Sequence, residues 1–220
     1  GAAYEQWAPG KKWSSALNTV RSAKDFFFPQ TENLMDFKVS GKTIEIVDTR
    51  REDEDFVVFG VRACDVRSMR VLDNVFLAPP VDTYYQNRRS HGVIVSVACS
   101  HPAASCFCGT FGIDASDPEG DVVCYRTEDA LYLNAKTEKG EALLSRLEQV
   151  TEVCDDTAAQ AEKKVIRERL SKLPLAELKP DAFGKDKTSE FFNAPEWKTL
   201  SESCLGCGTC TFICPTCQCY

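Results

Sequence analysis

No stretch of the sequence is apolar enough, over a sufficient length, to cross a lipid bilayer as a helix. The longest apolar stretches, FVVFGV and GVIVSVAC, have only the length of β-strands. The first residues, GAAYEQWAPGKKW, lack the apolar core of a secretory signal peptide. We therefore expect no membrane span. The clustered cysteines, which suit a reducing compartment, favour the cytoplasm.

An excess of positive charge is also missing. The 26 Lys and Arg residues stand against 33 Asp and Glu, which gives a formal net charge of −7. An acidic chain is a poor match for phosphate backbones, so we expect no nucleic-acid partner. The sequence contains no G-x-G-x-x-G, P-loop, H-E-x-x-H or nucleophile-elbow motif, and we expect this chain to bind no nucleotide itself.

Cysteine, by contrast, is abundant, with twelve residues in 220. An even number also fits a secreted, disulfide-bonded protein. The clusters of the form C-x-x-C and C-x-C, however, bring sulfur atoms together locally, as metal ligation requires, and a chain of this length rarely needs disulfides. The spacing therefore favours bound metal in a reducing compartment.

The residue composition and the secondary structure that it predicts change twice along the chain, which suggests three parts. Residues 1–140 should form an α/β (or α+β) body with a four-cysteine site. Residues 141–200 should form a charged helical linker. Residues 201–220 should begin a ferredoxin-like iron–sulfur module, which we expect to be truncated in the sequence given.

Local patterns predict the elements of the body. Stretches rich in Val, Ile and aromatic residues predict strands at 43–47, 56–61, 93–99, 121–126 and 131–135, the last two as a hairpin. Apolar residues recur every three to four positions in DVRSMRVLDNVF, which predicts an amphipathic helix over 65–76. A second such helix is predicted over 158–174, ending at Pro174.

The last seventeen residues, CLGCGTCTFICPTCQCY, hold six cysteines and no charged side chain. Four of them follow the spacing C-x-x-C-x-x-C-x-x-x-C, with a proline directly after the last: Cys204, Cys207, Cys210 and Cys214. Two intervening residues let the chain curl so that thiolates converge on an iron–sulfur cluster. Gly206 and Gly208 permit tight turns and let amides approach the cluster. Leu205, Phe212 and Ile213 should exclude water from it.

This spacing predicts a [4Fe–4S] cluster, with zinc as the alternative, because thiolates suit both metals. In two-cluster ferredoxins the fourth cysteine of such a run binds the other cluster, and a second run completes both ligand sets. The sequence given holds no second run. Either the protein continues beyond Tyr220, which we favour, or Cys217 and Cys219 complete the ligands.

Four further cysteines belong to the body: Cys64, Cys99, Cys106 and Cys108. The first two follow predicted strands directly. If those strands are parallel neighbours, both thiols emerge at one carboxyl edge of the sheet, where α/β folds place their sites. The loop CSHPAASCFCGTFG then returns the other two cysteines to that edge. We expect a second [4Fe–4S] cluster here, with a zinc tetrathiolate or a site without metal as alternatives.

Other residues near these positions have simpler interpretations. We interpret Cys124 and Cys154 as structural, His91 as a surface residue and His101 as a loop residue rather than a ligand. Four charged residues surround Cys64 and either tune a cluster, bind a partner or form a helix surface: Arg62, Asp65, Arg67 and Arg70. Arg88 and Arg89 are expected in a solvated turn, with an anionic cofactor of another subunit as the alternative.

Several stretches together resemble the iron–sulfur β subunit of cytoplasmic sulfhydrogenases. They are KDFFFPQTENLMDF, FGVRACDVRSMRVLDNVF, DTYYQNRR, ACSHPAASCFCGTFG and CLGCGTCTFICPTCQCY. The resemblance extends to the A subunit of anaerobic sulfite reductase and to related [4Fe–4S] dicluster subunits of flavin-linked oxidoreductases. It implies that Cys204, Cys207 and Cys210 bind one tail cluster, that Cys214 binds the next, and that the four body cysteines hold a further cluster.

The resemblance implies an electron-transfer subunit of an oxidoreductase complex rather than a stand-alone enzyme. It would relay electrons between a flavin- and NAD(P)-binding partner and a catalytic or second redox subunit, of the hydrogenase, sulfite reductase or heterodisulfide reductase type. Two alternatives remain open at this point. In the first, the chain would be a structural scaffold that binds zinc. In the second, its body thiols would catalyse sulfur or heterodisulfide reduction.

Overall fold

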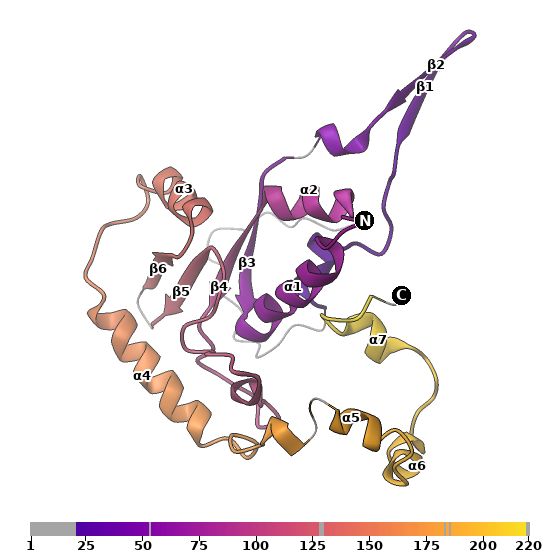
Figure 1. Ribbon diagram of the computed structural model, residues 1–220. Coiled ribbons are helices and arrows are strands. Elements are labelled where there is room, and N and C mark those ends of the chain that lie inside the picture. The colour runs from indigo at the N-terminus through magenta and orange to yellow at the C-terminus, as the bar shows by residue number, and fades with distance from the viewer. Residues whose placement is uncertain (1–20, 53, 128–129, 183, 185, 219–220) are drawn as a thin grey trace.

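The computed structural model describes residues 21–52, 54–127, 130–182, 184 and 186–218 (Figure 1). The strands are β1 (Asp36–Ser40), β2 (Thr43–Val47), β3 (Phe56–Arg62), β4 (Gly92–Val97), β5 (Val122–Arg126) and β6 (Leu131–Ala135). The α-helices are α1 (Ala63–Phe76), α2 (Thr83–His91), α3 (Glu138–Arg146), α4 (Thr157–Ser171), α5 (Lys187–Glu190), α6 (Glu196–Ser201) and α7 (Thr209–Ile213). Short 3-10 helices are η1 (Ala23–Phe26), η2 (Thr49–Glu52), η3 (Cys108–Phe111) and η4 (Pro180–Ala182). None of the described helices is long and apolar enough to cross a membrane.

Four strands form the central sheet, in the order β3-β4-β5-β6. The first three are parallel, and β5 and β6 form the antiparallel hairpin that the sequence predicts. The residues of β4 are buried or nearly so, as expected for a parallel strand inside a sheet. The mixed α/β class of the body is therefore confirmed.

Helix α1 follows β3 directly and packs against β3 and β4. Its predicted apolar stripe is buried, with Val66, Met69 and Leu72 in one cluster with Val58 of β3 and Ile94 of β4. Helix α1 is thus part of the connection between the parallel strands β3 and β4, and it packs on one face of the sheet. The amino terminus of α1 is thereby held at the carboxyl end of β3.

Helices α3 and α4 cover opposite faces of the sheet. Along β5, Val122 and Cys124 belong to the cluster that packs against α3, whereas Val123 and Tyr125 pack against Ile166 of α4. Successive strand residues point to opposite faces, so the two helices lie on either side. The helix predicted over 158–174 is thus part of the packed core and not a solvated connection alone.

Asp117 connects α4 to the loop between β4 and β5. Its carboxylate accepts a hydrogen bond from the Tyr125 hydroxyl at 2.6 Å and pairs with Lys163 of α4 at 3.0 Å and Lys136 at 3.1 Å. Lys163 also lies over the Tyr125 ring, 5.2 Å from its centroid. Burial opposes ionisation, but the hydrogen bonds outweigh it and lower the pKa of Asp117 to about 2.

The Asp117 carboxylate should make the stability of the body depend on pH at the acidic end. Because its folded pKa lies below the value of about 3.9 usual for an unfolded chain, the ionised group stabilises the folded state above that value. That contribution is lost as the pH falls toward 2. Asp117→Asn should lower the free energy of unfolding at neutral pH by about 1–3 kcal/mol and flatten this pH dependence. Urea unfolding at about pH 7 and about pH 3 measures both effects.

The matched change Tyr125→Phe removes one of the three contacts and keeps the ring. It should cost less stability than Asp117→Asn and leave most of the pH dependence in place. A pH dependence in Asp117→Asn as steep as in the unaltered protein would show that this carboxylate does not act as described.

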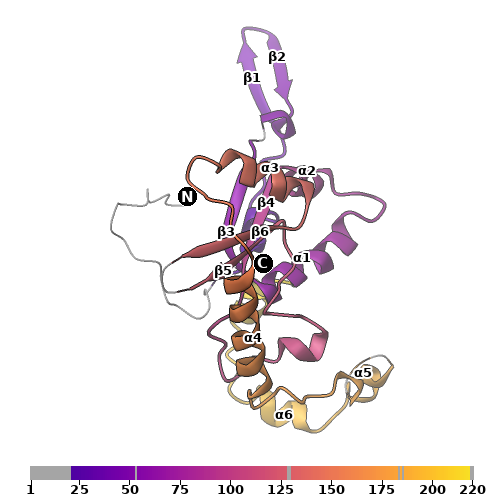
Figure 2. The same cartoon turned by 90° about the vertical axis from the view of Figure 1, so that its left-hand side faces the viewer.

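The predicted strand over 43–47 is observed as β2, but it does not join the central sheet. Within the described residues it pairs only with β1, and the two-stranded hairpin projects from the body (Figures 1 and 2). Phe37 is opposite Ile46, and Val39 is opposite Ile44, so these four apolar side chains share one face. All four are exposed.

Residues 83–91 form helix α2, where the sequence analysis expected a solvated turn. The Asp82 side chain caps this helix by accepting hydrogen bonds from the amides of Tyr84 and Tyr85, both at 3.0 Å. Arg88 pairs with Glu32, and Arg89 makes a two-pronged contact with Asp73 of α1. Both arginines therefore hold the body together, and the expected turn is wrong.

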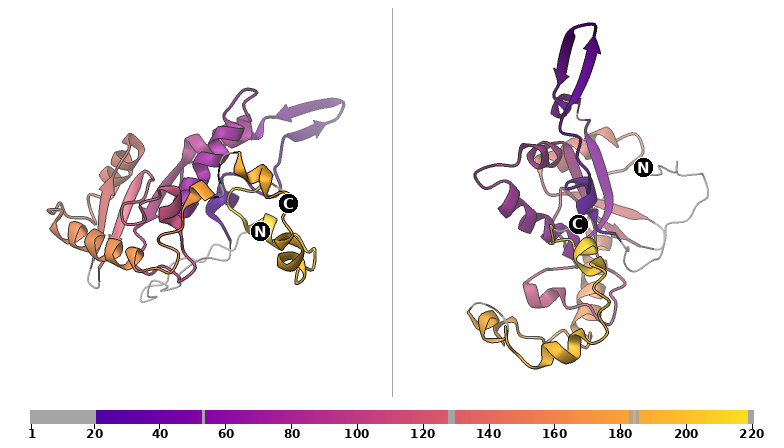
Figure 3. Two further views of the ribbon diagram at one scale, coloured as in Figure 1. Left: turned by 60° about the horizontal axis from the view of Figure 1, so that its bottom comes forward. Right: turned by 90° about the vertical axis from the view of Figure 1, so that its right-hand side faces the viewer.

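After α4 the chain leaves the body. Helices α5 and α6 lie along an arm that extends away from the sheet, and the chain returns to the body at α7, beside η1 (Figures 1 and 3). Side chains along the arm are mostly exposed. The cysteine tail is thus brought next to a segment nearly two hundred positions earlier in the sequence.

Candidate functional site

The body cysteines lie where the sequence analysis expected them. Cys64 is the second residue of α1, directly after β3, and Cys99 follows the end of β4 by two residues. Because β3 and β4 are parallel neighbours, both residues emerge at the same carboxyl edge of the sheet. The amide of Cys99 donates to the carbonyl of Ala115 at 2.8 Å, which ties the following loop to this edge.

The other two body cysteines are carried back by that loop. Cys106 closes a turn by donating its amide to Ala103, and Cys108 begins η3. Gly112 ends η3 with a φ of 65°, in the left-handed region, and its amide bonds back to Gly109 and Cys108. A cavity of about 200 Å³ lies between this loop and the end of α4, and Cys106 and Cys108 line it together with Leu170.

The four thiols influence one another electrostatically. Burial raises the pKa of Cys64 to about 11, with nearby Asp65 and Cys108 adding to it. Burial also raises the pKa of Cys99, and Cys106 and Cys108 raise it further, although Arg62 opposes them. The pKa of Cys108 is raised by burial and by Cys106. Without a cation, Cys64, Cys99 and Cys108 therefore prefer to stay protonated, and a metal must displace their protons.

The donor set fits a metal chemically, since four thiols at one edge suit an iron–sulfur cluster or zinc. Among the described residues, no group of three or more Cys, His, Asp or Glu side chains is arranged so that it could hold a metal ion. The structure thus brings the body cysteines to one edge without arranging their sulfur atoms as a coordination sphere.

The tail contains the tight backbone turns that its glycines predict. Gly206 and Gly208 have φ values of 66° and 71°, and Gly208 caps the start of α7. The amide of Gly206 donates a hydrogen bond to the sulfur of Cys204 at 3.4 Å. The hydroxyl of Thr209 lies 3.2 Å from the sulfur of Cys207.

Hydrogen bonds to sulfur lower the pKa of two tail thiols, in contrast to the raised pKa values in the body. Hydrogen bonds from the hydroxyl and amide of Thr209 lower the pKa of Cys207. Burial alone would raise the pKa of Cys214, but hydrogen bonds from Thr216 and Cys217 lower it. Cys204, Cys207 and Cys210 are exposed, and the lowered pKa of Cys207 favours its thiolate.

The expected apolar cover over the tail is only partly present. Leu205 is 93% exposed and Ile213 is also exposed, whereas Phe212 is partly buried. That these side chains exclude water from a cluster stays a prediction. Cys217 is partly buried, and Cys219 lies outside the described residues.

Lys24 is a residue of this region that the sequence analysis did not single out. It lies in η1 and is fully buried, and its ammonium donates to the carbonyl oxygens of Cys214 and Cys217, both at 3.0 Å. The only available signal was its place at the start of the stretch KDFFFPQTENLMDF. Nothing in local sequence predicts a partner so far along the chain.

The remaining candidates near the body site have partners in the structure. The Arg62 guanidinium lies 3.9 Å from the sulfur of Cys99. Arg67 and Arg70 both pair with Glu119, at 2.9 and 3.0 Å. These contacts fit a role for Arg62 beside the thiols and a structural role for the other two.

The two histidines and Cys124 have surroundings that fit the sequence analysis, whereas the structural role expected for Cys154 stays a prediction. His91 pairs with Asp55 at 3.1 Å, and His101 contacts Ser100 at 3.0 Å in the loop. Cys124 is buried in β5 within the sheet core, as a structural residue should be. Cys154 is exposed between α3 and α4, outside both cysteine groups.

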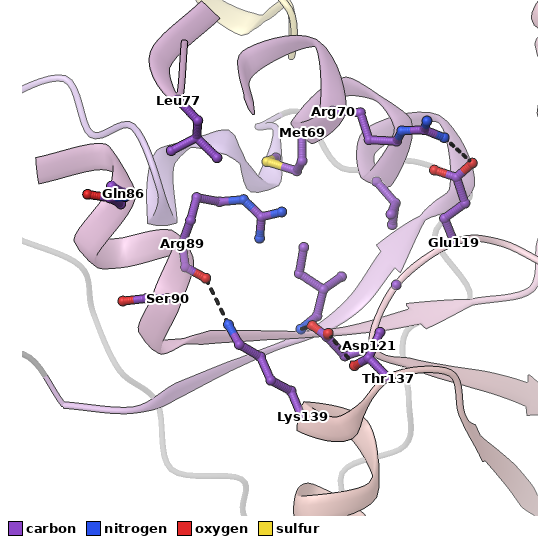
Figure 4. A pocket seen from close by; sticks show the side chains of 13 residues that line it. Met69, Arg70, Leu77, Gln86, Arg89, Ser90, Glu119, Asp121, Thr137 and Lys139 are labelled. Carbon is purple, nitrogen blue, oxygen red and sulfur yellow. Dashed lines mark hydrogen bonds and ion pairs between the residues drawn. The ribbon is translucent and has the colours of Figure 1, made fainter. Parts of the chain in front are cut away.

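A second cavity, of about 510 Å³, contains none of the cysteines (Figure 4). Met69 and Leu77 line it beside charged side chains from α1, α2 and α3. Those charges already have partners. Arg70 pairs with Glu119, and Lys139 donates to the carbonyl of Arg89 at 2.9 Å. The polar groups of this cavity are thus used to join the helices to the sheet.

Comparison with known proteins identifies the family. The chain is 31% identical over 204 residues to "Sulfhydrogenase 2 subunit beta" of Pyrococcus furiosus, and the match covers 92% of this chain. The chain belongs to the sulfhydrogenase β-subunit family. It spans 58% of the length of that relative. No family model matches the sequence, and no solved structure matches it. The family named from the sequence motifs is therefore confirmed.

Proposed function

We propose that this chain is an iron–sulfur electron-transfer subunit of a multi-subunit oxidoreductase. The observation that carries the proposal is the presence of two separate cysteine groups in a member of the sulfhydrogenase β-subunit family. One group lies at the carboxyl edge of the sheet, and the other forms the tail loop around α7. Two groups of this kind suit a relay in which an electron passes from one to the other.

In this proposal, Cys64, Cys99, Cys106 and Cys108 hold a [4Fe–4S] cluster in the body. Cys204, Cys207 and Cys210 hold a cluster in the tail, and Cys214 binds a neighbouring one. When bound, such clusters supply one-electron transfer and no bond chemistry on a substrate. The chain's own residues set how readily they accept an electron, through the Gly206 amide at Cys204 and the Arg62 guanidinium at Cys99.

The proposed partners are a flavin- and NAD(P)-binding subunit and a catalytic subunit of the hydrogenase, sulfite reductase or heterodisulfide reductase type. Hydride chemistry would take place on the flavin of the partner, since that cofactor carries it. The projecting β1–β2 hairpin supports membership of a larger assembly. A two-stranded hairpin is marginally stable alone, and its apolar face is exposed.

Metal analysis of anaerobically purified protein tests the proposal directly. We expect iron and acid-labile sulfide in equal amounts, a brown colour, and an electron paramagnetic resonance signal after reduction. A colourless protein that contains zinc would support the alternative of a structural scaffold and would contradict the relay.

Replacing a body thiol distinguishes a relay from thiol catalysis. Cys106→Ser should lower the iron content by about four atoms per chain and remove one of the cluster signals. The exposed Cys154→Ser, outside both groups, should leave iron and spectra unchanged. If Cys106→Ser keeps its iron but abolishes turnover by the assembled complex, the body thiols are a catalytic site and the relay assignment of the body is wrong.

A further inference from the structure

Lys24 is a fully buried lysine whose hydrogen bonds reach the tail. Its ammonium donates to the carbonyl oxygen of Cys214 and to that of Cys217, each at 3.0 Å. Lysine is almost never fully buried in folded proteins unless its charge is compensated by hydrogen bonds or a counter-charge. The burial of this side chain is therefore tied to the position of the tail.

The two carbonyls belong to the ends of one turn. The amide of Cys217 donates to the carbonyl of Cys214 at 3.3 Å, so residues 214–217 form a closed turn around Pro215. Cys214 is also the residue at which α7 ends. A cation at the carboxyl end of a helix interacts favourably with the carbonyls left unpaired there. Lys24 thus binds both ends of the turn that follows the fourth ligand position.

The segment that carries Lys24 is anchored in the body. Phe27, at the end of η1, is buried in the α1 cluster, with its ring 5.5 Å from that of Phe56 of β3. The Arg89 guanidinium lies over the Phe27 ring at 5.2 Å. Phe28 packs against Phe76 at the end of α1, 4.6 Å between ring centroids. Lys24 is consequently held by the same core that positions Cys64.

We propose that Lys24 is the positioning residue that fixes the tail cysteine turn on the body, and that its charge favours reduction of a cluster held by the tail. The positioning role stands on the contacts alone, whereas the effect on reduction rests on the proposed function. A fixed positive charge beside a cluster stabilises the added electron, so it raises the reduction potential. The same residue would then hold the tail turn on the body and raise the reduction potential of a cluster there.

The test uses Lys24→Met, which removes the charge and the two hydrogen bonds but keeps a similar apolar stem. In metal-free protein, amide hydrogen exchange in residues 205–217 should become faster, on the order of tenfold or more, while exchange in β4 and β5 stays unchanged. In iron-loaded protein, the reduction potential of a cluster held by the tail cysteines, Cys214 included, should fall. Lys24→Arg should restore the potential because it keeps the charge.

A matched control is Lys38→Met, which removes a lysine charge from the exposed hairpin strand β1. It should change neither tail exchange nor potential. The proposal is overturned if Lys24→Met leaves both unchanged, or if it accelerates exchange equally in the tail and in β4 and β5, since Lys24 would then serve general stability. If the unaltered protein binds no iron, the proposed function fails, but the exchange measurement still decides whether Lys24 holds the tail.

Discussion

Cys207→Ser is expected to remove a whole iron–sulfur cluster, about four iron atoms and four sulfides per chain, from anaerobically purified protein. Cys207 lies in the middle of the tail run, and its sulfur is exposed and hydrogen-bonded to Thr209. A serine hydroxyl keeps the size of the side chain but is a far poorer ligand for iron than a thiolate. Loss of one ligand from a compact loop leaves the other two unable to hold the cluster.

Iron and sulfide analysis together with electron paramagnetic resonance measures the loss. The body cluster should remain, because Cys64 and its neighbours lie at the sheet edge and do not depend on the tail loop. Cys154→Ser is the control, since that thiol is also exposed but belongs to neither group. An unchanged iron content in Cys207→Ser would mean that the tail run is not a cluster site.

The second large effect concerns stability rather than metal. Leu72→Ala should lower the free energy of unfolding by about 2–5 kcal/mol, because Leu72 is 0% exposed at the centre of the cluster between α1 and the sheet. The loss combines the transfer free energy of the removed methyl groups with the cavity that they leave. For a domain whose whole stability is about 5–15 kcal/mol, this is a large fraction.

Val75→Ala in the same helix is the matched control. Val75 is 49% exposed, and its truncation should change the free energy of unfolding by no more than about 0.5 kcal/mol. Urea unfolding of both variants in the same buffer compares them directly. Similar losses in the two variants would show that the described packing of α1 does not stabilise the body as stated.

Local sequence patterns were a good guide to the central sheet and to α1. One apolar stretch ends at Val61, and apolar residues recur every three to four positions from Val66 to Leu72. Each pattern indicates a regular element with a buried side, because burial follows the repeat of the strand or helix. The same reasoning placed Cys64 and Cys99 together, because the carboxyl ends of parallel neighbours share an edge.

The errors arose where a contact distant in sequence determines the local structure. Helix α2 is polar along most of its length, so its periodicity is weak, and the cap at Asp82 was the usable signal. Arg89 is held in that helix by Asp73 of α1, which no pattern within 83–91 indicates. The strand at 43–47 was recognisable, but its choice of β1 over the central sheet was not.

The sequence alone determined which cysteines stand at ligand spacing and where α1 and the strands of the central sheet lie. Both features depend on residues only a few positions apart, and the covalent backbone limits how such residues can be arranged. Only the tertiary structure decided that the tail turn is bound by Lys24 and that Asp117 joins α4 to the sheet. Such contacts join residues that are far apart in the sequence and are brought together by packing of the core. Patterns over a few positions therefore do not predict them.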